Sequence, residues 1–226
     1  LNEGLRLKPD SVSSYITRGN VYHAKGDLDR AIDDYNQAMQ RDPRDAIAVH
    51  NRGLMYLHKK DLDRAVGDFS EAIVLRPSYA DAFNNRGVAF QRKGDSDRAL
   101  ADYSEAISLN PKHVLALDNR GQIYEDRGDY DRAIADYSTA IELQPDNAGF
   151  WNSRCWVRAM ANRDLERALS DCDRSLRINP REANTLDSRG LVYLRLGRVE
   201  DSLKDYNEAL QLDPKKAFSL YGRGLA

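Results

Sequence analysis

The sequence lacks an excess of either charge, a long apolar run and more than a few cysteines. Its 34 basic and 36 acidic side chains leave a net charge of −2, so no basic field would attract nucleic acid or anionic lipid. No apolar stretch approaches the ~20 residues of a membrane span, and residues 1–30 contain no signal-peptide core, which favours a cytoplasmic protein without membrane insertion. Two cysteines cannot cross-link a small secreted scaffold.

Arginine and aspartate, by contrast, are abundant. Arginine (25) far outnumbers lysine (9), and aspartate (27) far outnumbers glutamate (9). Hydrophobic residues still make up 41% of the chain, enough to bury a core and to exclude wholesale disorder. This bias indicates that the same charged residues recur at fixed positions, which is typical of an internal repeat.

A repeat of 34 residues runs through the chain. Prolines stand at 9, 43, 77, 111, 145, 180 and 214, always 34 apart except for one step of 35. An Arg-Gly pair keeps this frame at Arg18-Gly19, Arg52-Gly53, Arg86-Gly87, Arg120-Gly121, Arg189-Gly190 and Arg223-Gly224. Three residues after the glycine comes an aromatic: Tyr22, Tyr56, Phe90, Tyr124 and Tyr193. A second signature follows, with Ala31, Ala65, Ala99, Ala133 and Ala168 each preceding Tyr35, Phe69, Tyr103, Tyr137 or Cys172 by four residues.

These spacings predict two helices in each repeat. In the third repeat, Phe83, Gly87 and Phe90 have the i, i+4, i+7 spacing of one helix face. Between the two helices lies Gly94-Asp95, where the glycine suits a left-handed C-terminal position and the aspartate can cap the next helix.

The pattern resembles the tetratricopeptide repeat, and the near-identical Asp-Arg-Ala-Ile segments most resemble bacterial members of that family. The resemblance implies an all-α, right-handed superhelical solenoid of antiparallel helix hairpins, continuous over residues 1–226. We expect six full repeats, at 12–45, 46–79, 80–113, 114–147, 148–182 and 183–216. Residues 1–11 would end a preceding repeat, and residues 217–226 would begin a further one.

Two charged positions depart from the family pattern. Arginine replaces the usual leucine before the glycine at Arg18, Arg52, Arg86, Arg120, Arg154, Arg189 and Arg223. The second helix carries a matching aspartate at Asp34, Asp68, Asp102, Asp136, Asp171 and Asp205. Because an unpaired half-buried charge is costly, we predict Arg–Asp pairs within a repeat or to its neighbour. The alternative is a ladder of arginines that binds a phosphorylated or acidic partner.

The fifth repeat is irregular. Cys155 replaces its glycine, Arg158 its first aromatic and Cys172 its second, and one residue is inserted near Asn162. Its two tryptophans either compensate for the lost aromatics or mark a kink or a binding hot spot. The two cysteines could lie close together on facing helices, and we expect free thiols rather than the alternative of a disulfide, since nothing in the sequence indicates an oxidising compartment.

No catalytic or metal-binding motif is present. The sequence contains no G-x-S-x-G, P-loop, HExxH or CxxC. The histidines of the first two repeats are not spaced i, i+4 on one helix, and the many carboxylates recur with the period, as scaffold residues do. We therefore predict a protein that is not an enzyme and that holds no metal or cofactor.

The resemblance also implies a binding site, because the first helices of this family line a concave groove that takes extended peptides. The candidate groove residues are Asn20, His23, His50, Asn51, Leu54, Asn84, Asn85, Gln91, Asp118, Asn119, Gln122, Glu125, Asn152, Trp156, Asp187 and Leu191. Asparagine amides both donate to and accept from a peptide backbone. The acidic centre at Asp118, Glu125 and Asp126 favours a basic or neutral segment.

The chaperone-binding members of the family grip a carboxylate with lysines and asparagines. Asn20 and Asn51 match the asparagines, but Ile16 and Asp81 stand at the lysine positions, which argues against an acidic chaperone tail. The predicted function is a non-enzymatic scaffold for a protein or peptide partner, with no nucleic acid. The alternatives are end-to-end self-association through uncapped half-repeats, or the targeting arm of a larger enzyme.

Overall fold

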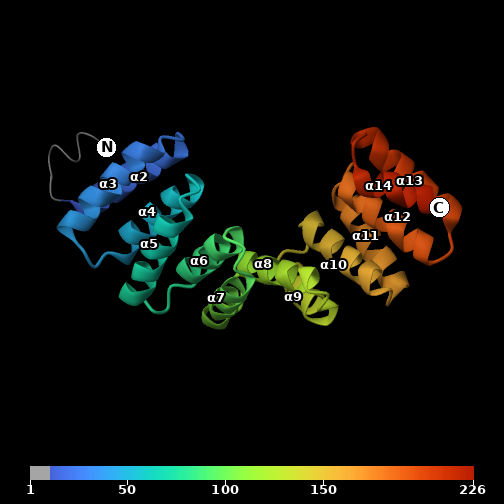
Figure 1. Ribbon diagram of the computed structural model, residues 1–226, viewed down its shortest axis with the longest axis horizontal. Helices are drawn as coiled ribbons and strands as arrows, with labels where there is room; N and C mark the ends of the chain where they lie inside the picture. Colours follow the sequence, from blue (N-terminus) through green and yellow to red (C-terminus); the bar gives the residue numbers. More distant parts are fainter. Residues whose placement is uncertain (1–10) are drawn as a thin grey trace. The chain divides into compact units, whose positions relative to one another are not determined.

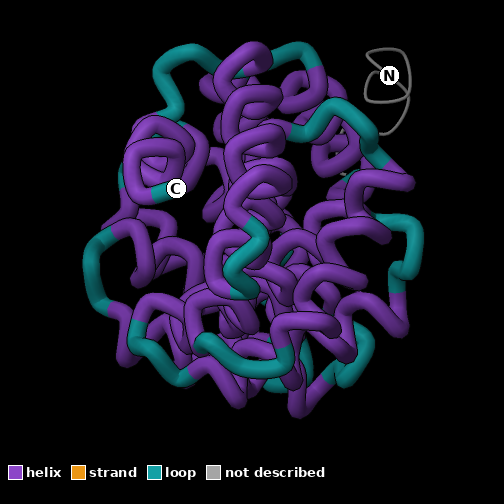
Figure 2. Tube along the Cα trace, turned by 90° about the vertical axis from the view of Figure 1, so that its right-hand side faces the viewer, coloured by secondary structure: helices purple, strands orange, loops and turns teal. Residues whose placement is uncertain are grey.

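The computed structural model describes residues 11–226, which form thirteen helices and no strand (Figure 2). The helices are α2 (Val12–Ala24), α3 (Leu28–Arg41), α4 (Ala46–His58), α5 (Leu62–Leu75), α6 (Ala80–Arg92), α7 (Ser96–Leu109), α8 (Val114–Asp126), α9 (Tyr130–Leu143), α10 (Ala148–Ala161), α11 (Leu165–Ile178), α12 (Ala183–Arg195), α13 (Val199–Leu212) and α14 (Ala217–Leu225). They fall into two compact units, unit 1 up to Ala116 and unit 2 from Leu117 onward. The repeat end predicted over residues 1–11 lies, apart from Ser11, outside the described residues.

Consecutive helices pair as hairpins, such as α4 with α5 in unit 1 and α12 with α13 in unit 2 (Figure 1). The turns have the chemistry that the sequence predicted. Gly94 has φ of 83°, and the Asp95 side chain accepts the backbone N–H of Arg98 at 3.0 Å, capping α7. The predicted all-α fold of helix hairpins is confirmed.

A glycine packed against an aromatic ring closes five of the hairpins. A Cβ built on Gly87 would lie 2.7 Å from Cε1 of Tyr103, so only glycine allows this approach. The same contact joins Gly19 to Tyr35, Gly53 to Phe69, Gly121 to Tyr137 and Gly190 to Tyr206. All five rings are buried, as expected for core residues.

The predicted Arg–Asp pairs are confirmed in all six repeats. In the third, Nε and Nη2 of Arg86 donate to the two carboxylate oxygens of Asp102 at 2.9 and 2.8 Å. Its Nη1 reaches back to Oγ of Ser70 in the preceding hairpin at 3.1 Å. The equivalent pairs are Arg18–Asp34, Arg52–Asp68, Arg120–Asp136, Arg154–Asp171 and Arg189–Asp205. The N–H groups of these arginines therefore bind aspartates within the protein. They are not available to bind a phosphorylated or acidic partner, which argues against the alternative of an arginine ladder.

The prediction of two free thiols is wrong. Cys155 on α10 and Cys172 on α11 form a disulfide with their Cα atoms 5.5 Å apart, and both residues are fully buried. The physical reason is their position. They replace the glycine and the aromatic ring that touch in the other hairpins, so their side chains point directly at each other.

Candidate functional site

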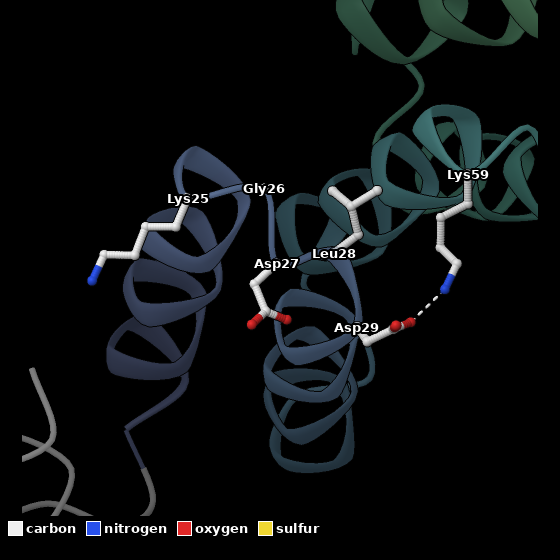
Figure 3. A pocket seen from close by; sticks show the side chains of 6 residues that line it. All are labelled: Lys25, Gly26, Asp27, Leu28, Asp29 and Lys59. Atoms are coloured by element: carbon white, nitrogen blue, oxygen red, sulfur yellow. Dashed lines mark hydrogen bonds and ion pairs between the residues drawn. The ribbon is translucent and has the colours of Figure 1, made fainter.

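A shallow pocket lies at the turn between α2 and α3. It is lined by Lys25, Gly26, Asp27, Leu28, Asp29 and Lys59, and Lys59 forms an ion pair with Asp29 across it (Figure 3). One repeat later, Lys93 and Asp63 form the same pair beside a matching pocket. Because the pocket recurs with the period and holds paired charges, we assign it to the scaffold.

The predicted binding residues lie on the first helix of each hairpin, here called the first-helix face: α2, α4 and α6 in unit 1, and α8, α10 and α12 in unit 2. In unit 1 the amides of this face bind one another. Oδ1 of Asn20 accepts both the hydroxyl of Tyr35, at 2.8 Å, and Nδ2 of Asn51, at 3.2 Å. Nδ2 of Asn84 donates to Oδ1 of Asn85 at 3.2 Å. The two asparagines that match the chaperone clamp are thus occupied by neighbours within the protein.

His50 joins these amides and stays neutral. Only 5% of its surface is exposed, and its Nε2 accepts Nδ2 of Asn85 at 2.9 Å. Its Nδ1 lies 3.3 Å from Oδ1 of Asn51 and 3.2 Å from the hydroxyl of Tyr79. Burial lowers the pKa of the His50 imidazole, because the charged form would lose its hydration.

The remaining candidates of unit 1 have local contacts. Nε2 of His23 lies 3.2 Å from Nδ1 of His58, and the amide oxygen of Gln91 accepts the hydroxyl of Tyr103 at 2.7 Å. Leu54 packs against the buried core, so it contributes more to packing than to a surface. Polar partners on this face of unit 1 are therefore largely satisfied internally.

Unit 2 differs because two carboxylates on its α8 have no cationic partner in the part of the chain that the structure describes. Burial raises the pKa of Asp118, and it also raises the pKa of Glu125, to which the nearby charges of Asp126 and Asp118 contribute. Glu125 accepts the hydroxyl of Tyr137 at 3.2 Å. Within residues 11–226, neither Asp118 nor Glu125 forms an ion pair.

An aromatic side chain stands beside these carboxylates. The indole of Trp156 on α10 interacts with Glu125, which partly offsets the effect of burial on its pKa. The indole also meets the ring of Phe218 edge-on, with centroids 4.8 Å apart, and packs against the core around the disulfide. Trp156 therefore fills space, as the packing interpretation expected, while remaining half-buried beside the acidic groups.

Asn152, which lies on α10 like Trp156, has an acceptor without a hydrogen bond. Its Oδ1 is shielded from solvent and accepts no hydrogen bond from any residue that the structure describes. Asp187 on α12 is satisfied, since it accepts Oγ of Ser219 at 2.5 Å and lies 3.9 Å from Nζ of Lys216. Burial raises the pKa of Asp187, and these two neighbours partly reverse the effect.

The structure thus places some of the sixteen candidates in two clusters and leaves the remaining candidates apart. Asn20, Asn51, His50, Asn84 and Asn85 form one network, whereas Asp118, Glu125 and Trp156 form another. Gln122 is exposed, Asn119 is half-buried, and Leu191 is buried in the core beside the disulfide.

Three residues that the sequence did not suggest as binding residues complete these clusters: Tyr79, Tyr137 and Phe218. Tyr137 carried only the signal of a core aromatic. Over the described residues, no group of three or more histidines, cysteines or carboxylates is placed to hold a metal ion. No helix among them is both long and apolar enough to span a bilayer.

Models of the tetratricopeptide repeat match most of the chain. Two carry the description "Tetratricopeptide repeat", one matching residues 84–148 and 119–183 and the other residues 157–219. A third, "TPR repeat", matches residues 19–60 and 53–94. No curated protein matches the sequence significantly.

Solved structures of this kind share the fold. PilF of Pseudomonas aeruginosa superposes with a TM-score of 0.82 at 15% identity, over 95% of this chain and 97% of that chain. PilW, a type IV pilus biogenesis factor, has a TM-score of 0.77 at 18% identity, over 93% and 97%. YrrB, described as having an unusual peptide-binding site, has a TM-score of 0.66 at 22% identity, over 83% and 96%.

Paired helices that repeat about every 34 residues, each closed by an Arg–Asp pair and five of the six by a glycine–ring contact, define a helical-repeat protein. The chain belongs to the tetratricopeptide repeat family. Proteins of this family are generally non-enzymatic scaffolds for protein–protein interaction, and the fold supports that class here.

Proposed function

We propose that this protein is a scaffold that binds a segment of a partner polypeptide, and that the first-helix face of unit 2 receives a basic side chain of that segment. The supporting observation is the pair of half-buried carboxylates, Asp118 and Glu125, which have no cation among residues 11–226. A half-buried carboxylate forms its strongest hydrogen bond with a charged donor, because the low local dielectric strengthens the attraction between the two charges.

The neighbouring groups suit the same ligand. The half-buried indole of Trp156 lies beside Glu125, and a guanidinium or ammonium group that pairs with this carboxylate would also be near an aromatic ring, to which cations are attracted. Unit 1 contributes fewer free groups, since its amides already bind one another.

Binding of labelled peptides tests this proposal. We expect an extended Arg/Lys-containing peptide to bind, and an Asp/Glu-containing peptide of equal length not to bind. Asp118→Asn combined with Glu125→Gln should lower the affinity for the basic peptide about tenfold or more. A tenfold change corresponds to ~1.4 kcal/mol of binding free energy. Glu142→Gln, which removes an exposed carboxylate on α9, is the matched control.

Two outcomes would contradict the proposal: equal affinity for both peptides, or the same loss in the Glu142→Gln control. Acidification gives a further check. Because the pKa values of both carboxyls are raised, they should protonate earlier than ordinary carboxyls as the pH falls, and affinity should fall with them.

Self-association is a second candidate, favoured by exposed apolar side chains on α14. Leu220, Tyr221 and Leu225 are 45%, 65% and 58% exposed, and exposed apolar groups of this kind often mark interaction surfaces. Light scattering over a concentration series tests it, and a constant monomer mass would argue against it.

A further inference from the structure

The hairpin of α10 and α11 is closed by a covalent bond where the others are closed by packing. In five hairpins a glycine lies against an aromatic ring of the second helix, as Gly121 lies against Tyr137. Here the disulfide between Cys155 and Cys172 occupies that place, and no ring is present. The bond has replaced the contact that holds the two helices together.

Trp156 packs against the core around the disulfide, but the charged groups of this hairpin do not compensate for the missing ring. In the neighbouring hairpin, Tyr124 packs under the guanidinium of Arg132, 4.4 Å from the ring centroid. The equivalent of that tyrosine is Arg158, which instead donates to Asp171 at 2.5 Å. Arg154 already pairs with the same carboxylate, at 2.8 Å.

Two cations therefore share one buried anion inside this hairpin. Nε of Arg158 is buried and has no acceptor among the described residues, and burial lowers the pKa of its guanidinium. Such a group destabilises the folded hairpin, because a buried donor without a partner loses its hydration without replacement. The closed hairpin depends on the disulfide more than a hairpin of the common type would.

The first helix of this hairpin also carries part of the proposed binding surface. Trp156 follows Cys155 directly, and Asn152 lies on the same helix. Trp156 packs against the core cluster that contains both cysteines, together with Val192 of α12. Movement of α10 away from α11 would therefore displace the indole from Glu125.

We propose that the Cys155–Cys172 disulfide is a redox control of the unit 2 binding surface: oxidised, it holds α10 in the binding arrangement, and reduction loosens the hairpin. The reductant is a dithiol. It gives two electrons and two protons, so that the protein disulfide becomes two thiols and the dithiol becomes a disulfide. Both cysteines are fully buried, so reduction requires opening of the hairpin. The control of binding rests on the proposed function, whereas the loosening does not.

Hydrogen exchange with and without dithiothreitol tests the loosening. The cysteines are 17 residues apart in sequence, and a loop of about that size contributes ~3 kcal/mol, which corresponds to roughly a hundredfold. We expect amide exchange in α10 and α11 to rise by about that factor on reduction, and exchange in α6 and α7 to stay unchanged. A mass increase of about 2 Da, from the two hydrogens gained, confirms reduction.

The matched control restores the common contact. Cys155→Gly combined with Cys172→Tyr puts the glycine and ring of the other hairpins into this one, and its exchange should be slow and indifferent to reductant. Cys155→Ser combined with Cys172→Ser should exchange as fast as the reduced protein under all conditions. Unchanged exchange in the reduced protein, or failure of dithiothreitol to reduce the folded chain, would overturn the proposal.

Peptide binding then separates the two claims. Tighter binding of the basic peptide by the oxidised protein than by the reduced one supports redox control. Equal binding together with faster exchange would refute the control and leave the loosening intact. If the basic peptide binds neither form nor the Gly/Tyr variant, the proposed function fails, and the exchange result still decides the loosening.

Discussion

Removal of one member of a buried Arg–Asp pair is the sharpest test of how this scaffold holds together. Asp102 is 5% exposed, and the side chain of Arg86 is 21% exposed. Both oxygens of Asp102 accept from the guanidinium, at 2.9 and 2.8 Å. Arg86→Met would leave a buried carboxylate without its charged partner.

The expected cost is about 3 kcal/mol of unfolding free energy for Arg86→Met, at the lower end for a broken buried pair because the arginine reaches solvent. Asp102→Asn keeps one acceptor and should cost about 2 kcal/mol. The double variant should cost clearly less than the sum, with a coupling of about 2 kcal/mol. Part of the arginine's effect comes from its bond to Ser70, which Ser70→Ala measures separately.

Hydrogen exchange of α6 and α7 is the appropriate assay, because repeat arrays unfold by segments and a single global free energy is then poorly defined. Asp63→Asn serves as the control, since that carboxylate is 87% exposed and exposed pairs contribute little. Additive single-variant effects, with no coupling, would refute the argument that the pair is a buried structural unit.

Three further predictions concern packing and pH. Gly87→Ala should destabilise by ~1–3 kcal/mol, because its Cβ would meet the ring of Tyr103 at 2.7 Å. Gly67→Ala, also within a helix but with no atom inside 4 Å, should stabilise by about 1 kcal/mol; thermal unfolding of both variants tests the contrast. His50 has a lowered pKa, so as the pH falls below about 6.5 the unfolded chain takes up the proton first. The stability that neutral His50 contributes is therefore present above that pH, and it is lost as the pH falls toward the lower pKa that His50 has in the folded protein. Urea midpoints at pH 7.5 and 5.5 should differ more for the wild type than for His50→Gln.

The fold could be predicted because its signals are local and repeated. The spacing of Gly87, Phe90, Ala99 and Tyr103 recurs in hairpin after hairpin, so each copy supports the others. The pairing of Arg86 with Asp102 could also be predicted. Each repeat has one such arginine on its first helix and one such aspartate on its second, and leaving both half-buried charges unpaired would be costly. The prediction of free thiols is wrong because the position of Cys155 opposite Cys172 decides whether they bond, and the absence of a signal for an oxidising compartment does not.

The binding surface could be predicted only as a set of positions. The sequence placed asparagines on the first helices, but it could not show that Asn20 and Asn51 would bind each other. It also could not show that Asp118 would stay without a cation while Asp187 found Ser219. Those differences depend on side chains about 32 residues away that stacking brings into reach.

Periodic residue types, read from the sequence alone, therefore determined the helices, their turns and the charge pairs of this protein. Each of these features is decided within one hairpin, where the spacing along the chain fixes which side chains meet. The tertiary structure alone decided which polar groups remain available, because that depends on contacts between hairpins. It also decided that Cys155 and Cys172 are bonded, because only packed helices bring two sulfur atoms together at a position where the other hairpins place a glycine and a ring.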